Sequence, residues 1–280
     1  MSRYYHTINK ANRTLQHIHF PGISTFQHGL DIQSALMEQN LNYKRLESKI
    51  RRIEKLNSTL SFNKQALLYK LHQLQPPATV LTFQFENVYA SGLKLKKQIS
   101  QQDIENFTRF GCKFYQLERG GQVTWHGKGQ LVAYVVVDLK SFVKLSAKCF
   151  VNRVLLQSVV NVLAKFGVQG KILDENPGIW VMNNHGEEER EDKIASVGVR
   201  VRHGVTEFGI ALNIDPNLKF LNTFEMCGLK LKQATSLRRE LQKSSGQKED
   251  TLPSIDEAAT LFAKEVAKAL EMENIDKIVL

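Results

Sequence analysis

Cysteine is scarce in this 280-residue chain, and its spacing excludes two kinds of stabilising site. The three cysteines are Cys112, Cys149 and Cys227, an odd number without a CxxC pair. A disulfide framework needs paired cysteines, and a structural zinc site needs closely spaced ligands. The sequence therefore predicts a protein of a reducing compartment, held together by the hydrophobic core that a chain of this length and 42% hydrophobic content can bury.

Long uncharged apolar runs are also absent. The most apolar stretch, residues 131–139, contains Asp138 and is followed by Lys140. It falls well short of the ~18 apolar residues that a helix needs to cross a bilayer. The sequence predicts no membrane span.

The N-terminal segment lacks acidic residues. The first is Asp31, whereas Arg3, Lys10 and Arg13 precede it among Ser, Thr, Asn and Gln. This composition is typical of a mitochondrial targeting segment, which we place over residues 1–17. An ordinary unstructured terminus is the alternative for the same composition.

The net charge of +10 is compatible with nucleic acid, an anionic membrane surface or acidic protein partners. Basic residues are spread along the whole chain, however, and we find no zinc finger, aromatic RNA-binding signature or basic-region zipper. A non-catalytic nucleic-acid-binding protein is therefore the weaker hypothesis, and we expect no nucleic-acid partner.

Hydrophobic spacing predicts a helical start followed by strands around a central helix. Helical periodicity over residues 30–74 ends at Pro76-Pro77. Strands are expected over residues 78–89, 113–117, 131–139, 178–182, 194–201 and 205–214, and helices over 151–166 and 254–272, the last opened by a Ser254 capping box. The charged stretch 183–192 is expected to be a solvated loop. The pattern indicates an α/β (α+β) fold, a single sheet-based domain with packed helices over residues 18–280.

A glycine-rich segment, RGGQVTWHGKGQ at residues 119–130, lies between two of the expected strands. Glycine lets backbone N–H groups approach an acyl or phosphate oxygen without obstruction by a Cβ atom. The segment lacks the GK[ST] ending of a Walker loop. A strained connector without a ligand is the alternative interpretation.

Three segments, in order, resemble the lipoyl (octanoyl) transferase family. They are RGGQVTWHGKGQLVAYVVVDL at 119–139, KIASVGVRVRHGVTEFGIALNI at 193–214, and the Met226-Cys227-Gly228-Leu229 site. The resemblance runs over residues 18–237, with weaker agreement at 80–92. It implies the catalytic fold of biotin and lipoate protein ligases.

The resemblance also implies a reaction. An octanoyl group would leave acyl carrier protein, form a thioester on Cys227, and pass to a lysine of a lipoyl domain of the 2-oxoacid dehydrogenase complexes or of the glycine cleavage H protein. Lys193 matches the reactive partner of Cys227, and a neighbouring ammonium favours the nucleophilic thiolate. A buried, inert cysteine is the alternative for Cys227 taken alone. The resemblance implies no cofactor and no metal.

The same comparison implies which residues surround the acyl thioester. Small residues suit a narrow apolar channel, and backbone N–H groups can stabilise an oxyanion. The implied substrate-binding residues are Arg119, Gly120, Gly121, Gln122, Val123, Thr124, Trp125, His126, Ser196, Val197, Gly198, Gly209, Ile210 and Ala211. For Ala211, ordinary strand packing is the alternative.

The chain departs from the family pattern at three positions. Phe208 stands where many members have His, Trp125 replaces a more usual Tyr, and Lys128 replaces a more usual Pro. If that histidine orients the thioester, this protein must do without it or use His126 or His203.

The nearest rival function is an ATP-dependent lipoate or biotin protein ligase. Such an enzyme uses a Gly/Arg-rich adenylate loop and needs no nucleophilic cysteine. Because both Lys193 and Cys227 match the transferase pattern, we favour the transferase.

Overall fold

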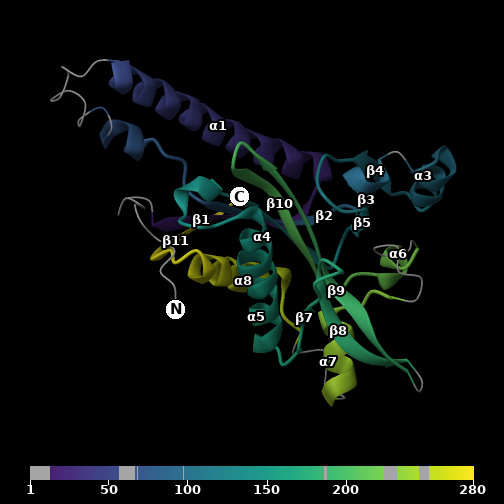
Figure 1. Ribbon diagram of the computed structural model, residues 1–280. Coiled ribbons are helices and arrows are strands. Elements are labelled where there is room, and N and C mark those ends of the chain that lie inside the picture. The colour runs from purple at the N-terminus through teal and green to yellow at the C-terminus, as the bar shows by residue number, and fades with distance from the viewer. Residues whose placement is uncertain are drawn as a thin grey trace.

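The computed structural model describes residues 13–56, 67, 69–96, 98–185, 188–223, 232–245 and 252–280. Within these residues the chain forms a mixed α/β domain with one large and one small sheet (Figure 1). The large sheet contains β1 (Thr14–Ser24), β2 (Thr79–Phe85), β6 (Gln130–Val136), β7 (Lys171–Ile172), β8 (Ile179–His185), β9 (Glu188–Arg202), β10 (Val205–Asn213) and β11 (Asn274–Val279). The small sheet contains β3 (Val88–Ser91), β4 (Lys113–Gln116) and β5 (Val123–His126).

The helices are α1 (Phe26–Leu56), α3 (Gln101–Thr108), the run α4 (Ala147–Cys149), η4 (Phe150–Leu156) and α5 (Gln157–Lys165), then α6 (Leu218–Leu221), α7 (Leu237–Ser245) and α8 (Ile255–Ala269). Short 3-10 turns occur at η2 (Leu93–Leu95) and η3 (Leu139–Ser141). The predicted α/β class, with helices packed on a sheet, is confirmed.

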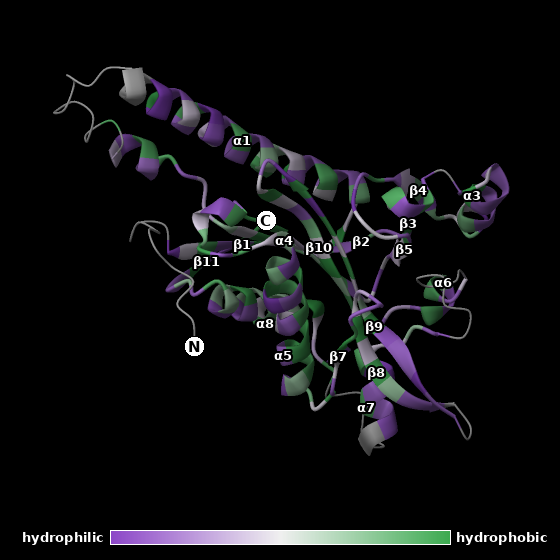
Figure 2. Ribbon diagram, in the orientation of Figure 1, coloured by the Kyte–Doolittle hydropathy of each residue, from purple (hydrophilic) through white to green (hydrophobic). Residues whose placement is uncertain are grey.

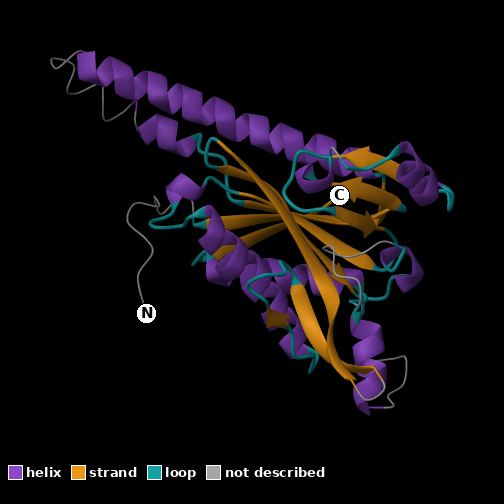
Figure 3. Cartoon of the chain, turned by 45° about the vertical axis from the view of Figure 1, so that its right-hand side comes forward, coloured by secondary structure: helices purple, strands orange, loops and turns teal. Residues whose placement is uncertain are grey.

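The described strands of the large sheet lie in the order β11-β1-β2-β6-β10-β9-β8-β7. Helix α1 packs on β2, β6 and β10, while α8 packs on β1, β2 and β6 and η4 packs on β9 and β10. Figures 1 and 3 show that α1 begins beside the small sheet and extends past the large sheet at its other end. Helices therefore cover the large sheet on both faces.

Strand β6 lies at the centre of this arrangement. Every one of its residues is buried, as expected for an apolar strand covered on both sides. It pairs antiparallel with β2 on one edge and with β10 on the other. Because its side chains alternate between the two faces, β6 contributes to the core under α1 and to the core under α5 and α8.

The central helix was expected over residues 151–166, and it is found over Ala147–Lys165. Its middle part, η4, is a π-helix. By length and composition alone this run is apolar enough to cross a membrane. In this fold it is a core helix, because Val159, Val162 and Leu163 are fully buried in the cluster shared with α8.

Two local expectations were wrong. Residues 78–89 form two strands instead of one, because the chain leaves the large sheet at Phe85 and enters the small sheet at Val88. Residues 183–185 and 188–192 do not form a loop. Strands β8 and β9 continue through this charged stretch as paired strands, and Figure 2 shows the outer part of β9 as hydrophilic.

The charged hairpin is stable because its polar groups find partners. Asn183 and Asp192 are both buried, and the Asn183 amide donates hydrogen bonds to the Asp192 carboxylate (3.0 Å) and to Glu240 of α7 (3.1 Å). Buried polar side chains are tolerated when they are hydrogen-bonded. A charged sequence is therefore compatible with a paired strand here.

The strands nearest to the chain ends, β1 and β11, were not expected from the sequence. Strand β1 lies between β11 and β2 and is parallel to both. Leu15 is fully buried and His17 is buried. The targeting segment predicted over residues 1–17 overlaps the first residues of this strand, and it stays a prediction. Residues 1–12 are outside the described part of the chain.

This placement predicts different outcomes for two truncations. Removing residues 1–12 should leave the free energy of unfolding unchanged, because β1 stays complete. Removing residues 1–17 should lower the free energy of unfolding. The loss of one buried leucine, Leu15, costs about 1.5–3 kcal/mol, and the total loss should be larger because paired backbone is removed as well. Denaturant unfolding of both truncated chains measures the difference. Equal stability of the two chains would contradict the placement of β1.

Candidate active site

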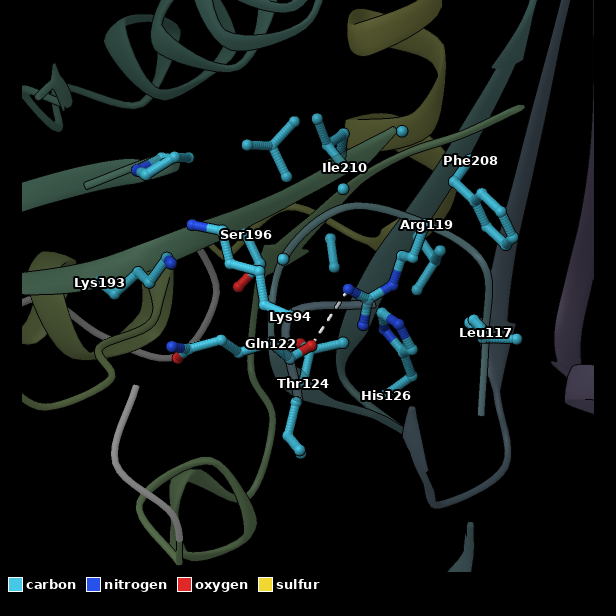
Figure 4. Close-up of a pocket in the computed structure, with 18 of the residues that line it drawn as sticks. Lys94, Leu117, Arg119, Gln122, Thr124, His126, Lys193, Ser196, Phe208 and Ile210 are labelled. Carbon is cyan, nitrogen blue, oxygen red and sulfur yellow. Dashed lines mark hydrogen bonds between the residues drawn. The ribbon is translucent and has the colours of Figure 1, made fainter. Parts of the chain in front are cut away.

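A cavity of ≈ 140 Å³ lies where the glycine-rich segment meets the centre of the large sheet. Figure 4 shows Lys193 at one side of it and Phe208 and Leu117 at the other. The cavity brings together Lys193 and most of the residues expected to bind substrate, which are Arg119, Gly121, Gln122, Val123, Thr124, His126, Ser196, Val197, Gly198, Gly209, Ile210 and Ala211. We refer to it as the pocket.

The floor of the pocket is made by two paired strands that carry small residues at facing positions. Ser196 of β9 pairs with Ala211 of β10, and Gly198 pairs with Gly209. A Cβ atom on Gly209 would lie 2.2 Å from the Ala133 carbonyl oxygen, so only glycine fits there. The absence of large side chains on this stretch of sheet creates the space.

Two of the residues expected to bind substrate do not line the pocket. Trp125 lies between Thr124 and His126 on β5, and side chains alternate along a strand. Its ring therefore points away from the pocket and stacks on Phe220, with centroids 5.2 Å apart. Gly120 instead fixes the loop, because its N–H donates to the Val199 carbonyl oxygen at 3.1 Å.

Arg119 was expected to bind substrate, but its guanidinium contacts the protein backbone. The guanidinium donates to the carbonyl oxygens of Gly120 (2.9 Å) and Gln122 (3.2 Å) through Nη1 and of Ala90 (2.8 Å) through Nη2. Burial lowers the pKa of Arg119 to about 10, which still leaves it protonated at neutral pH. Arg119 thus holds the glycine-rich loop to β3.

His126 begins a chain of hydrogen bonds that crosses the site. Its Nδ1 bonds to Gln130 Oε1 (2.8 Å), Gln130 Nε2 donates to Asn213 Oδ1 (2.9 Å), and Asn213 Nδ2 donates to the Thr235 carbonyl oxygen (2.9 Å). The Thr235 N–H in turn donates to the Lys193 carbonyl oxygen (2.9 Å). Because Gln130 Oε1 can only accept, Nδ1 carries the proton.

The electrostatic environment keeps that imidazole neutral. His126 is buried, and desolvation is the main cause that lowers its pKa to about 4, with the nearby Arg119 charge lowering it further. With the proton on Nδ1, the neutral ring has Nε2 as a hydrogen-bond acceptor. The pocket therefore contains a neutral histidine in a fixed tautomer at physiological pH.

Lys193 is a buried lysine, with 6% of its surface exposed. Its Nζ lies 5.1 Å from the centroid of the Trp180 ring, a cation–π distance. A Cβ atom on Gly178 would lie 2.5 Å from Lys193 Cε, and Gly178 has φ +137°, a value that favours glycine. Trp180 and Gly178 thus fix the ammonium group at one end of the pocket.

Cys227 lies outside the described residues, and the described chain that follows it is anchored beside Lys193. Ala234 N donates to Asn222 Oδ1 at 2.8 Å, which joins the two ends of the intervening segment. Ala234 also forms a parallel bridge with Lys193. The described residues on the two sides of Cys227 are therefore joined to each other, and those that follow it are joined to Lys193.

Several pocket residues were not expected from the sequence. They are Phe26, Lys94, Leu117, Val132, Tyr134, Glu175, Asn176, Pro177, Phe208 and Leu221. The period-2 alternation of β6 could have placed Val132 and Tyr134 on one face, whereas Phe26 arrives from a distant helix. His203 is in the turn between β9 and β10 and does not line the pocket, so it cannot replace the family histidine.

The depressed pKa of His126 predicts how stability depends on pH. The unfolded chain binds a proton near 6.5 and the folded chain only near 4, so stability is full above this window and falls as the pH drops through it. His17, which burial also shifts to about 4, contributes in the same direction. His126→Asn should therefore lose less stability across the window than the wild type in urea unfolding. Identical losses would contradict a neutral, buried His126.

Comparison with known proteins agrees with this architecture. Residues 59–266 match the family model described as the lipoyl protein ligase A/B catalytic domain. The chain is 36% identical to "Octanoyltransferase, mitochondrial" of Kluyveromyces lactis, over 98% of this chain and 85% of the relative. It is 33% identical to the protein of the same name in Saccharomyces cerevisiae, over 98% and 87%.

Solved structures share the fold at low sequence identity. A lipoate-protein ligase A bound with ATP superposes with a TM-score of 0.51 at 14% identity, covering 73% of this chain and 76% of that one. P. falciparum LipL1 in complex with lipoate gives 0.53 at 12%, covering 95% and 66%. From the family model and the two yeast relatives, this chain belongs to the lipoyl protein ligase A/B catalytic-domain family.

Proposed function

We propose that this protein is an octanoyltransferase that moves an octanoyl group from acyl carrier protein, through a thioester on Cys227, to a lysine of a lipoyl-accepting protein. The observation that carries the proposal is the pocket. It has a fixed lysine at one end, a floor of small residues and an apolar far end. The names of the two yeast relatives support the choice of octanoyl transfer.

The first half-reaction loads the enzyme. The Cys227 thiolate attacks the carbonyl carbon of the donor thioester, a new C–S bond forms, and the electron pair of the C=O bond moves to oxygen. Collapse of this intermediate breaks the old C–S bond and releases the donor thiol, which takes up the proton that Cys227 gave up. The Lys193 ammonium favours the thiolate and can hold that proton between the two events.

The second half-reaction unloads it. The neutral amine of the acceptor lysine attacks the same carbonyl carbon, a C–N bond forms, and Cys227 leaves as a thiolate. The amine proton passes to Lys193, which has to be neutral at that moment.

The described pocket residues serve both steps by positioning. Backbone N–H groups of the glycine-rich loop and of β9 are suited to stabilise the oxyanion of each intermediate. The Arg119 contacts keep that loop in one conformation, and the chain of hydrogen bonds from His126 to Thr235 ties the pocket wall to the anchored segment beside Lys193. These contacts reduce the reorganisation that the reaction requires.

The proposed partners are octanoyl-acyl carrier protein as donor, and lipoyl domains of the 2-oxoacid dehydrogenase complexes and the glycine cleavage H protein as acceptors. Mitochondrial localisation is part of the proposal. It is supported by the two yeast relatives, which are named mitochondrial, and by the acid-poor first residues of this chain.

Two substitutions test the chemistry. Cys227→Ser should abolish turnover, because an alcohol attacks poorly beside a lysine and is a poor leaving group once acylated. Lys193→Ala should slow acyl-enzyme formation by roughly 10²–10⁴-fold without removing the nucleophile. It should also shift alkylation of Cys227 by iodoacetamide to higher pH, since the thiolate loses its charged neighbour.

Trp125→Phe is a suitable control, because Trp125 is as buried as the site residues but packs outside the pocket. It should retain octanoyl transfer. Near-normal transfer by Cys227→Ser, or an unchanged pH profile of alkylation in Lys193→Ala, would contradict the proposal. Transfer from free octanoate that requires ATP would favour a ligase instead.

Localisation has a separate test. Deletion of residues 1–12 should prevent mitochondrial import and preserve transfer by the purified protein, because β1 remains complete. Fluorescence microscopy of tagged chains in yeast would show the difference. Mitochondrial localisation of the truncated chain would count against a targeting role for this segment.

A further inference from the structure

The end of the pocket away from Lys193 is closed by aromatic rings. Phe208, Tyr134 and Phe26 all line the pocket and are exposed by 7%, 3% and 0%. They belong to the aromatic cluster under α1, which also contains Phe20, Phe83 and Phe85. Behind these three rings the space is filled by packed side chains, so the pocket ends there.

Phe208 is held in place by its neighbours. Its backbone N–H donates to Gln33 Oε1 of α1 at 2.6 Å, and its ring meets the Tyr134 ring edge to face at 5.6 Å. Its φ of +64° lies in the left-handed region, which a bulky residue occupies only where the surrounding structure imposes it. The ring therefore cannot move aside freely.

The strand register separates Phe208 from the reactive end. Phe208 pairs with Val199, which is six residues beyond Lys193 on β9, or roughly 20 Å along the strand. The two side chains lie on opposite sides of the pocket in Figure 4, with Ser196, Arg119 and His126 between them. An acyl chain whose carbonyl lies at the Lys193 end would run toward Phe208.

We propose that Phe208, supported by Tyr134, is the stop at the end of the acyl pocket and sets the longest acyl chain that the enzyme accepts. This inference rests on the proposed function, which places the acyl carbonyl beside Lys193. Each methylene buried on the way to the ring strengthens binding by about fourfold. A methylene that extends beyond the Phe208 ring has to displace packed aromatic side chains, and this cost cancels its favourable contribution to binding.

The experiment compares transfer from carrier-bound straight-chain acyl groups of increasing length to a lipoyl domain, with the full-length protein. The wild type should reach a maximum at one length and then fall steeply. Phe208→Ala should move the maximum to longer chains. Phe208→Leu, which retains a large apolar side chain, should give a smaller shift in the same direction.

Phe20→Ala is the matched control. Phe20 has the same exposure as Phe208, 7%, and stacks on Phe83 at 4.8 Å in the same aromatic cluster, but it does not line the pocket. The substitution removes the same ring from the same cluster. It should lower stability without changing the length profile, which separates a stop in the pocket from general loosening of the core.

A second measurement separates this inference from the proposed function. Binding of free straight-chain fatty acids, measured by calorimetry, needs no transfer chemistry. Affinity for the wild type should stop rising at a certain length, whereas the affinity of Phe208→Ala should continue to rise by about fourfold per methylene. If the wild type and the Phe208 variants have the same chain-length limit in both the transfer and the binding assay, Phe208 is not the stop. If no donor supports transfer but Phe208→Ala still binds longer fatty acids than the wild type, the proposed function is wrong and the role of Phe208 as the stop is supported.

Discussion

The backbone of Lys193 joins two parts of the structure. It pairs with Trp180 of β8 within the large sheet, and its N–H and C=O bond to Gln233 (2.8 Å) and Thr235 (2.9 Å) of the segment that follows Cys227. Such bonds are satisfied deep in the protein, where leaving a backbone group unpaired is costly. The position of the lysine, the anchoring of the segment beside it and the hydrogen-bond chain to His126 all depend on this junction.

Around the junction, the site divides into a polar end and an apolar end. The ammonium group of Lys193 lies at one end, where charge would develop during the proposed acyl transfer. The other end is lined by aromatic and aliphatic side chains from β6, β10 and α1. The neutral state of His126 fits this division, because a charged imidazole would oppose an apolar chain passing beside it. An amphiphilic acyl thioester matches both ends.

Much of this could be predicted from the sequence. Strand β6 and helix α8 were expected from local patterns, namely a continuous apolar run and an N-cap at Ser254. The charged β8–β9 hairpin was not, because its strands are stabilised by pairing and by the buried Asn183–Asp192 contact, which composition does not reveal. The strands β1 and β11 were missed for a similar reason, since each needs a partner from the other end of the chain.

The site was predictable to the extent that its residues lie close together in sequence. The segments at 119–126 and 193–211 supplied most of the pocket, but the orientation of Trp125 depends on which face of β5 meets the large sheet. Phe26 was not predictable, because a helix start far away in sequence reaches the pocket only through tertiary packing. Phe208 was noticed as a departure from the family pattern, and its place beside Tyr134 gives that departure a physical meaning.

The central claim is that acyl transfer proceeds through a covalent intermediate on Cys227. The most direct measurement is peptide mass spectrometry of the full-length protein after incubation with octanoyl-acyl carrier protein and without an acceptor. A covalent intermediate predicts one added octanoyl group on the peptide that contains Cys227, and the loss of this group when a lipoyl domain is added. Octanoyl transfer to the acceptor at the full rate, with no acylated Cys227 peptide at any time, would contradict it.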